Sequence, residues 1–234
     1  MGAVVYLIPT VLAEGITEPL PPYIIDAIKK CSVFFAENER TARRFFKSVW
    51  KGMVIDDYRW YSMKTVNNEV AGQFKQAVNA GKTIGIISEA GCPGVADPGQ
   101  GLVHIAQQMG AVVKPLVGPS SILLALMASG MNGQQFQFVG YLPIESGERL
   151  KTIKQLENDS RHKDCTQIFI ETPYRNNQLL ETLTKTLQPQ TQICVAVDLT
   201  AGTESIQTKT AQQWKAAMPD LHKRPAIFLI YAGK

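Results

Sequence analysis

Two kinds of segment alternate along this chain. Short runs of apolar and β-branched residues, typical of buried strands, are separated by stretches in which apolar residues recur at helical spacing. The expected strands are Val4–Ile8, Val33–Ala36, Thr83–Ser88, Val112–Leu116, Gln137–Gly140, Gln167–Glu171, Gln192–Val197 and Ala226–Tyr231. The expected helices are Pro22–Lys30, Thr41–Val49, Val66–Ala80, Leu102–Met109, Ser121–Ala128, Gly147–Glu157, Asn176–Leu187 and Ala211–Met218. This alternation predicts an α/β protein.

Glycines mark the ends of three expected helices. Gly81, Gly110 and Gly130 each follow a helical stretch directly, where a left-handed residue often ends the helix and glycine adopts that conformation without steric cost. The length of 234 residues suits two domains. We therefore expect an N-terminal α/β domain over 1–117 and a C-terminal α/β domain over 118–234.

Composition excludes several classes of protein. Hydrophobic residues make up 45% and charged residues 19%, without low-complexity tracts, which is typical of a soluble globular protein. Every apolar run is too short for a membrane helix, and the opening segment lacks the basic start of a signal peptide, so we expect a cytoplasmic protein without membrane contact. The four cysteines lie far apart and no histidine is spaced to join them, so we expect no metal site. A net charge of +4 permits an anionic partner such as RNA but does not require one.

The loop after the expected strand Thr83–Ser88 is the strongest candidate for a ligand site. It is rich in glycine and proline and much longer than the roughly 2–6 residues of an ordinary strand-to-helix connection. Glycines at the carboxyl end of a parallel strand let the backbone approach a ligand closely. Neither the dinucleotide-binding nor the P-loop glycine pattern occurs, which disfavours a dehydrogenase or a P-loop NTPase. Glu89 could accept hydrogen bonds from a ribose or an ammonium group, or could simply cap the loop.

Three further segments carry polar groups next to expected strands. Ser120 precedes an apolar helix, where it could contact a ligand or act only as a helix cap. Arg40, Arg43, Arg44 and Lys47 share one side of a helix, where they could bind phosphates or form a solvated face. Glu171 and Arg175 follow the strand Gln167–Glu171, and they could equally form a local ion pair.

Taken in order, these segments resemble the tetrapyrrole (corrin/porphyrin) methylase family of S-adenosylmethionine-dependent enzymes, and in particular its ribosomal small-subunit RNA 2′-O-methyltransferases. The sequence SEAGCPGVADPG over Ser88–Gly99 is similar to the signature S-D-A-G-T-P-G-I-S-D-P-G of that branch. GPSS from Gly118 matches its G-P-S-A turn, FVGYLP from Phe138 its F-x-G-F-L-P, and ETPYR from Glu171 its E-S-P-H-R.

The resemblance implies a homodimer of two-domain subunits that holds S-adenosylmethionine in the cleft between the domains, without a metal. It also implies ribosomal RNA or the small ribosomal subunit as the partner. Carried over by position, the cofactor contacts are Pro9, Ser88, Glu89, Ala90, Val95, Ser120, Ser121, Glu171, Leu199, Pro225 and Ala226. Because these contacts are mostly made by backbone, they tolerate changes of side chain.

The chain departs from the branch pattern at three places on the substrate side. PTVLA from Pro9 replaces T-P-I-G-N, ENERTA from Glu37 replaces E-D-T-R-H-T, and Glu89 replaces an aspartate. For a ribose hydroxyl acceptor, we expect Glu37 and Glu39 to remove the proton, and Arg40, Arg43 and Arg175 to position phosphates. Two alternatives stay open, namely methylation of a tetrapyrrole carbon and a non-catalytic RNA-binding protein that retains the fold.

Overall fold

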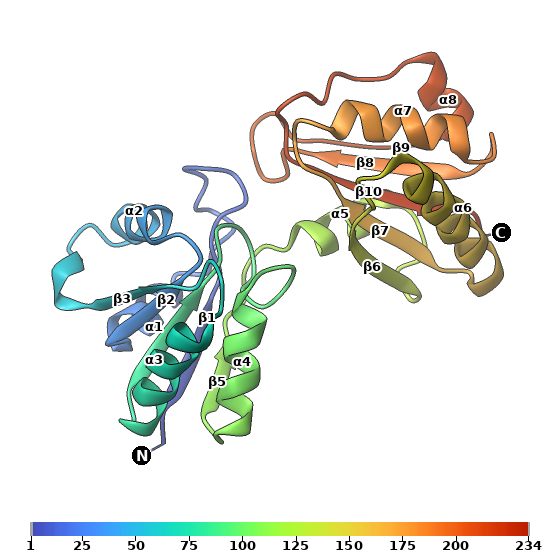
Figure 1. Cartoon of the computed structure of the whole chain (residues 1–234). Helices are drawn as coiled ribbons and strands as arrows, with labels where there is room; N and C mark the ends of the chain where they lie inside the picture. The colour runs from blue at the N-terminus through green and yellow to red at the C-terminus, as the bar shows by residue number, and fades with distance from the viewer. Residues whose placement is uncertain (1, 234) are drawn as a thin grey trace. The chain divides into compact units, whose positions relative to one another are not determined.

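The computed structural model describes residues 2–233, which form two compact units. Unit 1 comprises Met1–Ser120 and unit 2 comprises Ser121–Lys234. Each unit contains one five-stranded sheet with its own helices (Figure 1). Within residues 2–233, no helix combines the length and the apolar character needed to cross a membrane.

The sheet of unit 1 is entirely parallel. Its strands are β1 (Val4–Ile8), β2 (Val33–Ala36), β3 (Arg59–Ser62), β4 (Thr83–Ile87) and β5 (Val112–Pro115), in the spatial order β3-β2-β4-β1-β5. Because all five strands run in one direction, the loops that follow β1, β2 and β4 meet at the same edge of the sheet. That edge is where the ligand loop predicted from the sequence begins.

Helices cover both faces of this sheet. The helices are α1 (Ile24–Lys30), α2 (Glu39–Val49), α3 (Asn68–Asn79) and α4 (Gly99–Gln108), with a short 3₁₀ turn over Ile55–Asp57. One face packs Phe34 against residues of α1 and α2, including Phe46. The other face packs Phe35 against α3 and α4, including Phe74. Adjacent residues of β2 thus serve opposite cores, as the pleat of a strand dictates.

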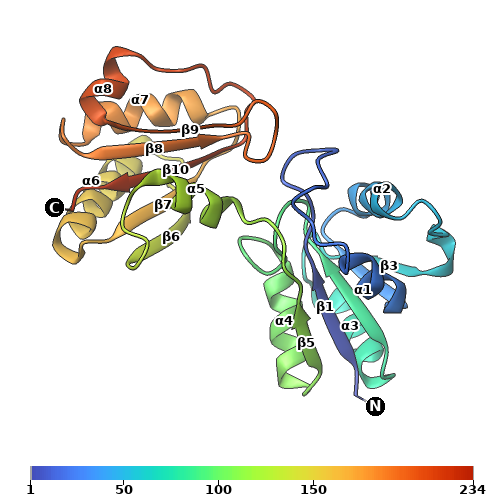
Figure 2. The ribbon, with the colours of Figure 1, turned by 180° about the vertical axis from the view of Figure 1, so that it is seen from behind.

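The sheet of unit 2 is mixed (Figure 2). Its strands are β6 (Phe136–Tyr141), β7 (Thr166–Ile170), β8 (Gln192–Val197), β9 (Ser205–Thr210) and β10 (Ala226–Tyr231), in the order β6-β7-β10-β8-β9. The β6–β7 pair is parallel, whereas the three pairs that involve β8, β9 or β10 are antiparallel. The helices are α5 (Ser121–Ser129), α6 (Ser146–Lys163), α7 (Asn176–Thr186) and α8 (Ala211–Ala216).

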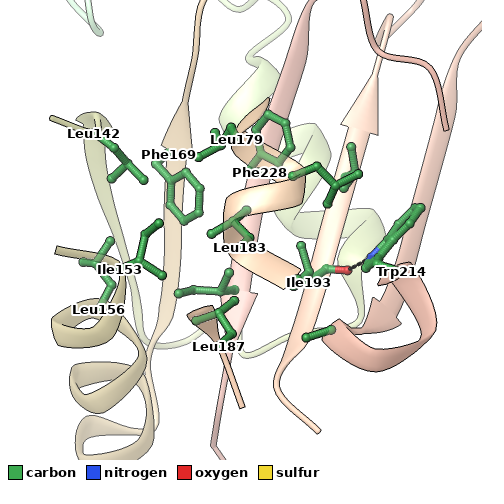
Figure 3. Packing of buried hydrophobic residues seen from close by; sticks show 14 of the residues in the cluster. Leu142, Ile153, Leu156, Phe169, Leu179, Leu183, Leu187, Ile193, Trp214 and Phe228 are labelled. Atoms are coloured by element: carbon green, nitrogen blue, oxygen red, sulfur yellow. Dashed lines mark hydrogen bonds between the residues drawn. The ribbon is translucent and has the colours of Figure 1, made fainter. Parts of the chain in front are cut away.

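A single apolar cluster holds α6, α7 and α8 against the sheet of unit 2 (Figure 3). Phe169 and Phe228 lie parallel on neighbouring strands with ring centroids 6.2 Å apart. Trp214 of α8 is buried, and its indole N–H donates to the carbonyl of Ile193 at 2.8 Å, so its one polar group is satisfied. Helix α5 instead packs on β8, β9 and β10 outside this cluster.

The predicted elements are confirmed, apart from two unpredicted edge strands and some helix ends. All eight expected strands and all eight expected helices are present. Gly81, Gly110 and Gly130 have φ values of 64°, 68° and 72°, which confirms their left-handed conformation. The expectation misses β3 and β9, which are edge strands without a single buried residue, and it ends α6 at 157 rather than at Lys163.

Candidate functional site

The candidate site of unit 1 is built on the loops that follow β1, β2 and β4. Thr10 follows β1, Glu37 follows β2 and Ser88 follows β4. The backbone N–H of Thr10 donates to the carbonyl of Gly91 at 2.9 Å, and that of Glu37 donates to the carbonyl of Ile87 at 3.0 Å. The three loops are therefore tied together by backbone hydrogen bonds.

The loop between β4 and α4 takes a backbone path that depends on its glycines. Gly91 and Gly94 have φ values of 71° and 84°, and Ala96 is also left-handed with φ of 58°. Oδ1 of Asp97 accepts the N–H groups of Gly94 at 2.9 Å and Gly99 at 2.7 Å, which closes the loop on itself. A left-handed alanine is strained by an amount of about 1–2 kcal/mol, so the loop shape is imposed by these contacts.

Asp97 has one carboxylate oxygen without a partner. Its Oδ2 is buried and accepts no hydrogen bond from the described part of the chain. Burial raises the pKa of the Asp97 carboxyl above its usual value, although the amides of Gly94 and Gly99 oppose this rise. Such an oxygen suits a hydrogen-bond donor brought by a ligand or by water.

The same loop contacts the turn at the end of unit 1. The Sγ of Cys92 lies 3.6 Å from the carbonyl oxygen of Gly118 and 3.4 Å from that of Pro119. A Cβ atom added to Gly118 would lie only 2.2 Å from Cβ of Pro9. Glycine is thus required at 118 for the turn to approach the loop after β1, and Pro9 and the turn that carries Ser120 lie side by side.

Glu37, Asn38 and Glu89 form a hydrogen-bonded group, which we call the carboxylate group. Oε2 of Glu37 accepts the backbone N–H of Glu89 at 3.0 Å. The Asn38 amide donates through Nδ2 to Oε1 of Glu89 at 2.9 Å. Oδ1 of Asn38 also accepts the amides of Arg40 and Thr41, so the same side chain caps α2.

Two departures from the family pattern therefore occupy contacting positions. An aspartate at 38 could cap α2 but could not donate to Glu89, and it would place a second negative charge at hydrogen-bond distance. Asparagine performs both functions. Asparagine at 38 therefore suits the glutamate at 89, because its amide donates a hydrogen bond to that carboxylate.

The pKa of Glu37 is raised above its usual value. Desolvation by burial is the largest cause, and the charges of Glu89 and Asp97 raise it further, while the Glu89 amide lowers it. A carboxylate with a raised pKa is a stronger proton acceptor than a free glutamate. Glu37 is therefore suited to accept a proton from a hydroxyl group.

Two pockets flank the carboxylate group, both within unit 1. A polar pocket of about 390 Å³ is lined by Glu37, Asn38, Glu39, Arg40, Ser62, Lys64 and Glu89. A second pocket of about 330 Å³ has an apolar wall that includes Val11, Leu12 and Phe45, and it reaches Ser88, Glu89 and Ala90. Glu89 lines both pockets, so its side chain lies between the polar pocket and the apolar wall of the second pocket.

The basic residues of α2 differ in whether another group of the protein pairs with their charge. Arg43 pairs with Glu39 at 3.0 Å and lies 5.2 Å from the Trp60 ring centroid. Arg44 pairs with Glu14 at 3.3 Å, and Lys47 donates to the carbonyl of Met53 at 2.6 Å near the end of the helix. Among the ion pairs of residues 2–233, none involves Arg40.

In unit 2, the expected site residues lie near one end of the sheet. Oε1 of Glu171 is paired with Arg175, at 3.0 Å from Nε, and the Glu171 side chain is 2% exposed. This pair is the local ion pair that the sequence allowed. The loop after β8 contains Leu199, which is buried between two left-handed residues, Asp198 and Thr200.

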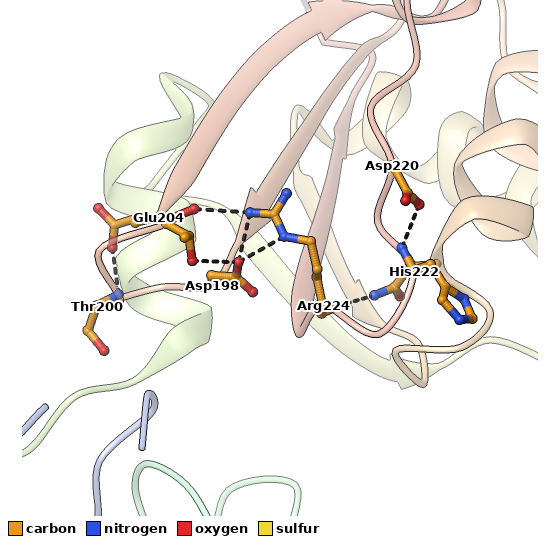
Figure 4. A network of polar contacts seen from close by, with 8 residues as sticks. Asp198, Thr200, Glu204, Asp220, His222 and Arg224 are labelled. Carbon is orange, nitrogen blue, oxygen red and sulfur yellow. Dashed lines mark hydrogen bonds and ion pairs between the residues drawn. The ribbon is translucent and has the colours of Figure 1, made fainter. Parts of the chain in front are cut away.

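A second polar network fixes that loop (Figure 4). Nε of Arg224 donates to Oδ2 of Asp198 at 2.8 Å, and the Arg224 guanidinium also donates to the carbonyl of Thr203 at 3.0 Å. The Thr200 amide donates to Oε2 of Glu204 at 2.7 Å. Arg224 precedes Pro225, so this network positions the entry to β10.

The expected cofactor residues differ in burial. Pro9, Ser88, Glu171 and Leu199 are buried, Ser120, Ser121 and Ala226 are half-buried, and Glu89, Ala90, Val95 and Pro225 are exposed. Sequence reasoning missed Ser62 and Lys64, because both follow or end the unpredicted strand β3. It also assigned no role to Asp97, although this residue stands within the quoted loop.

Comparison with known proteins identifies relatives. The model of the Tetrapyrrole (Corrin/Porphyrin) Methylases matches residues 15–214. The chain is similar to the Ribosomal RNA small subunit methyltransferase I of Vibrio cholerae serotype O1, with 32% identity over 155 residues, or 65% of this chain and 52% of that protein. It is 36% identical to the protein of the same name from Mesorhizobium japonicum over 134 residues, covering 57% and 44% of the two chains. The chain thus spans about half the length of these curated relatives.

Solved structures share the fold. The methyltransferase CobJ superposes with a TM-score of 0.65 at 18% identity, covering 99% of this chain and 94% of its own. The cobalt precorrin-4 methyltransferase CbiF gives a TM-score of 0.60 at 14% identity, covering 97% and 94%. These likenesses confirm the predicted architecture of two α/β units.

Proposed function

We propose that this chain, which belongs to the tetrapyrrole (corrin/porphyrin) methylase family, is an S-adenosylmethionine-dependent methyltransferase that modifies a ribose 2′-hydroxyl of small-subunit ribosomal RNA. The observation that supports the chemistry is the carboxylate group, in which Glu37 is held at the carboxyl edge of a parallel sheet with a raised pKa. The similarity to relatives named ribosomal RNA small subunit methyltransferase I supports the acceptor.

The residues near the unit 1 loops have the chemistry that the cofactor requires. S-adenosylmethionine carries an ammonium group, ribose hydroxyls and an adenine amine, which are all hydrogen-bond donors. The buried Oδ2 of Asp97 has no partner among residues 2–233, and Glu89 of the same loop is an exposed carboxylate. The groups present therefore fit the cofactor.

We propose cofactor contacts in unit 1 and in unit 2. In unit 1 they are Pro9, Ser88, Glu89, Ala90, Val95 and Ser120, and in unit 2 they are Ser121, Glu171, Leu199, Pro225 and Ala226. When bound, the cofactor supplies an electrophilic methyl group. The strained backbone at Ala96, Asp198 and Thr200 supports this assignment, because strain of this kind clusters at ligand sites.

Glu37 is the better of the two candidates for removal of the hydroxyl proton. One oxygen of Glu39 is occupied by the ion pair with Arg43 at 3.0 Å. Glu37 accepts a single amide hydrogen bond, from Glu89, and retains acceptor capacity on its other oxygen. We propose that Glu37 receives the proton as the oxygen attacks.

Arg40 and Lys64 are the cations best placed to hold phosphates beside this carboxylate. Both line the polar pocket, and both are exposed. Arg43 and Arg175 also remain candidates, but each would contact phosphate while it is paired with a glutamate. Replacement of Arg40 should therefore weaken RNA binding more than replacement of Arg43 does.

Two measurements test the proposed function. Calorimetric titration with S-adenosylmethionine and S-adenosylhomocysteine should give micromolar affinities, and labelled methyl groups should appear in small-subunit RNA at a 2′-oxygen. Binding without transfer to RNA or to a porphyrinoid would identify a non-catalytic protein. Transfer to a porphyrinoid but not to RNA would identify the tetrapyrrole alternative.

We further propose that the protein is a homodimer, as the family resemblance implies, and that it is cytoplasmic. Light scattering on the purified chain tests the oligomeric state, and a mass equal to one chain of 25.8 kDa would contradict it.

A further inference from the structure

Three exposed side chains gather at one end of the unit 2 sheet, and we call them the Tyr174 cluster. Tyr174 lies in the turn between β7 and α7, while His222 and Lys223 lie between α8 and β10. The Tyr174 and His222 rings meet edge to face, with centroids 6.0 Å apart and planes at 73°. Nζ of Lys223 lies 6.0 Å from the centroid of the Tyr174 ring.

The cluster is exposed although the backbone beneath it is firmly held. Tyr174 is 70% exposed, and His222 and Lys223 are also exposed. Buried Asn176 donates to the carbonyl of Arg224 at 2.6 Å, and the Lys223 amide donates to the carbonyl of Pro173 at 3.1 Å. The two segments are thus fixed to each other while their aromatic and cationic groups remain in water, which packing of the core does not explain.

The backbone at Lys223 is strained. Its φ is 60°, in the left-handed region that a residue with a long side chain rarely occupies. The lysine side chain lies over the tyrosine ring and is exposed to solvent. Strain that is not required for burial is a reason to look for a ligand.

The charge of Lys223 is uncompensated, unlike that of its neighbours. Arg175 is paired with Glu171, and Arg224 is paired with Asp198. The Asp220 carboxylate accepts the His222 amide at 3.0 Å and the Asn177 amide at 2.8 Å. Among the ion pairs of the described residues, none involves Lys223, so its ammonium is available to an anionic partner.

We propose that the Tyr174 cluster binds a single-stranded segment of the RNA substrate, with one base stacked on Tyr174 and Lys223 against an adjacent phosphate. This inference rests on the proposed function, because it takes RNA as the acceptor. An aromatic ring beside a cation is the arrangement by which proteins hold unpaired bases, and stacking accepts any base. In a duplex the bases are already stacked and unavailable, so the cluster selects unpaired RNA.

The position of the cluster in the sequence fits this role. Glu171 lies in the turn that leads to Tyr174, and Pro225 follows Lys223 and Arg224. Both are proposed cofactor contacts. RNA held by the Tyr174 cluster would therefore lie next to the unit 2 residues that serve methyl transfer.

The test is the affinity of the full chain for a fluorescent, unstructured RNA of about 20 nucleotides, long enough for more than one binding module. Tyr174→Ala should weaken binding about 5- to 150-fold, which corresponds to the loss of one stacked base. Tyr174→Phe and Tyr174→Trp should retain most of it. Lys223→Ala should reduce the salt dependence by about one phosphate contact, or a slope of roughly 0.7 for a single strand.

Matched controls separate binding from stability and from the proposed function. Tyr141 is a second exposed tyrosine of unit 2, on β6, so Tyr141→Ala should leave RNA affinity unchanged. Cofactor affinity of the Tyr174 variants, measured by calorimetry, should equal that of the wild type. If the wild type binds RNA and Tyr174→Ala binds it equally well, the cluster is not an RNA site and the proposed function stands. If the wild type binds cofactor but no single-stranded RNA, the cluster proposal is wrong, and transfer of labelled methyl groups to small-subunit RNA decides separately whether RNA is the acceptor.

Discussion

At the scale of single residues, the carboxylate group decides how activity should respond to pH. Glu37 must be ionised to accept a proton, and burial with the charges of Glu89 and Asp97 raises its pKa. Activity should therefore be full above this raised pKa and lost as the pH falls through it, at a higher pH than an ordinary glutamate would give. The measurement is the pH profile of kcat/KM. Glu37→Gln should lower kcat by roughly 10²–10⁴-fold.

Asn38→Asp is the sharper test of the same group. The variant keeps the cap of α2 but places a carboxylate 2.9 Å from Oε1 of Glu89 in place of the donating amide. The added charge should raise the pKa of Glu37 further and move the acid limb of the profile upward. Glu69→Gln on the exposed side of α3 is the control and should leave the profile unchanged. An unaltered profile in Asn38→Asp would exclude Glu37 as the proton acceptor.

Asp97 should make the free energy of unfolding fall as the pH rises. A salt-bridged aspartate has the opposite effect, because its pKa is lowered in the folded state. Because its folded pKa is raised, the stability linked to its protonated form is present at low pH and is lost as the pH rises through the folded pKa. Asp97→Asn keeps the acceptor for Gly94 and Gly99 and removes the charge. The variant should gain stability relative to the wild type as the pH rises from the usual aspartate pKa through the raised pKa of Asp97, as urea midpoints would measure. A relative loss over that range would contradict the raised pKa.

At the scale of elements, the close packing of β4 against β1 and β2 requires a glycine in the middle of a strand. A Cβ on Gly85 would lie 2.5 Å from Cδ1 of Phe34 and 2.9 Å from Cδ1 of Ile8. Gly85→Ala should therefore destabilise unit 1 by about 1–3 kcal/mol, as overpacking of a core does. Gly72→Ala in α3, where no atom lies within 4 Å of the added Cβ, should be neutral or stabilise by about 0.5–1 kcal/mol. Equal denaturation midpoints for the two variants would show that Phe34 and Ile8 accommodate the added methyl group without loss of stability.

Some elements and site residues could be predicted from the amino-acid sequence, and others could not. Strands such as β1 and β10 were predicted to the residue, because buried strands are continuous apolar runs. The edge strands β3 and β9 gave no such signal, since solvent accepts their polar side chains. The ligand loop was predicted from its glycines, but the contact of Asn38 with Glu89 joins residues from separate loops and could not be read from spacing. Lys64 was not predicted as a site residue, because it follows the strand β3, which the sequence did not reveal.

At the scale of the whole molecule, the two units rest on separate apolar cores. Leu183 belongs to the core of unit 2 and Leu102 to one of unit 1, and both are fully buried. Replacing either leucine by alanine should cost about 2–5 kcal/mol. Hydrogen exchange should show lost amide protection confined to the unit that carries the change, because the apolar contacts that stabilise each sheet lie within it. Loss of protection throughout the chain in both variants would show that the units unfold as one.

The position of β1 in its sheet has a consequence for how the protein is made. Val4 is paired with Thr83 on one side and Val112 on the other, so the first partner strand is translated 79 residues after β1 (83 − 4). Translation proceeds at about 5–20 residues per second, so the apolar strand VVYLI has no partner strand for roughly 4–16 seconds after its synthesis. During this interval β1 is an exposed apolar strand, and a slow stretch of translation before β4 would prolong the time in which it can aggregate.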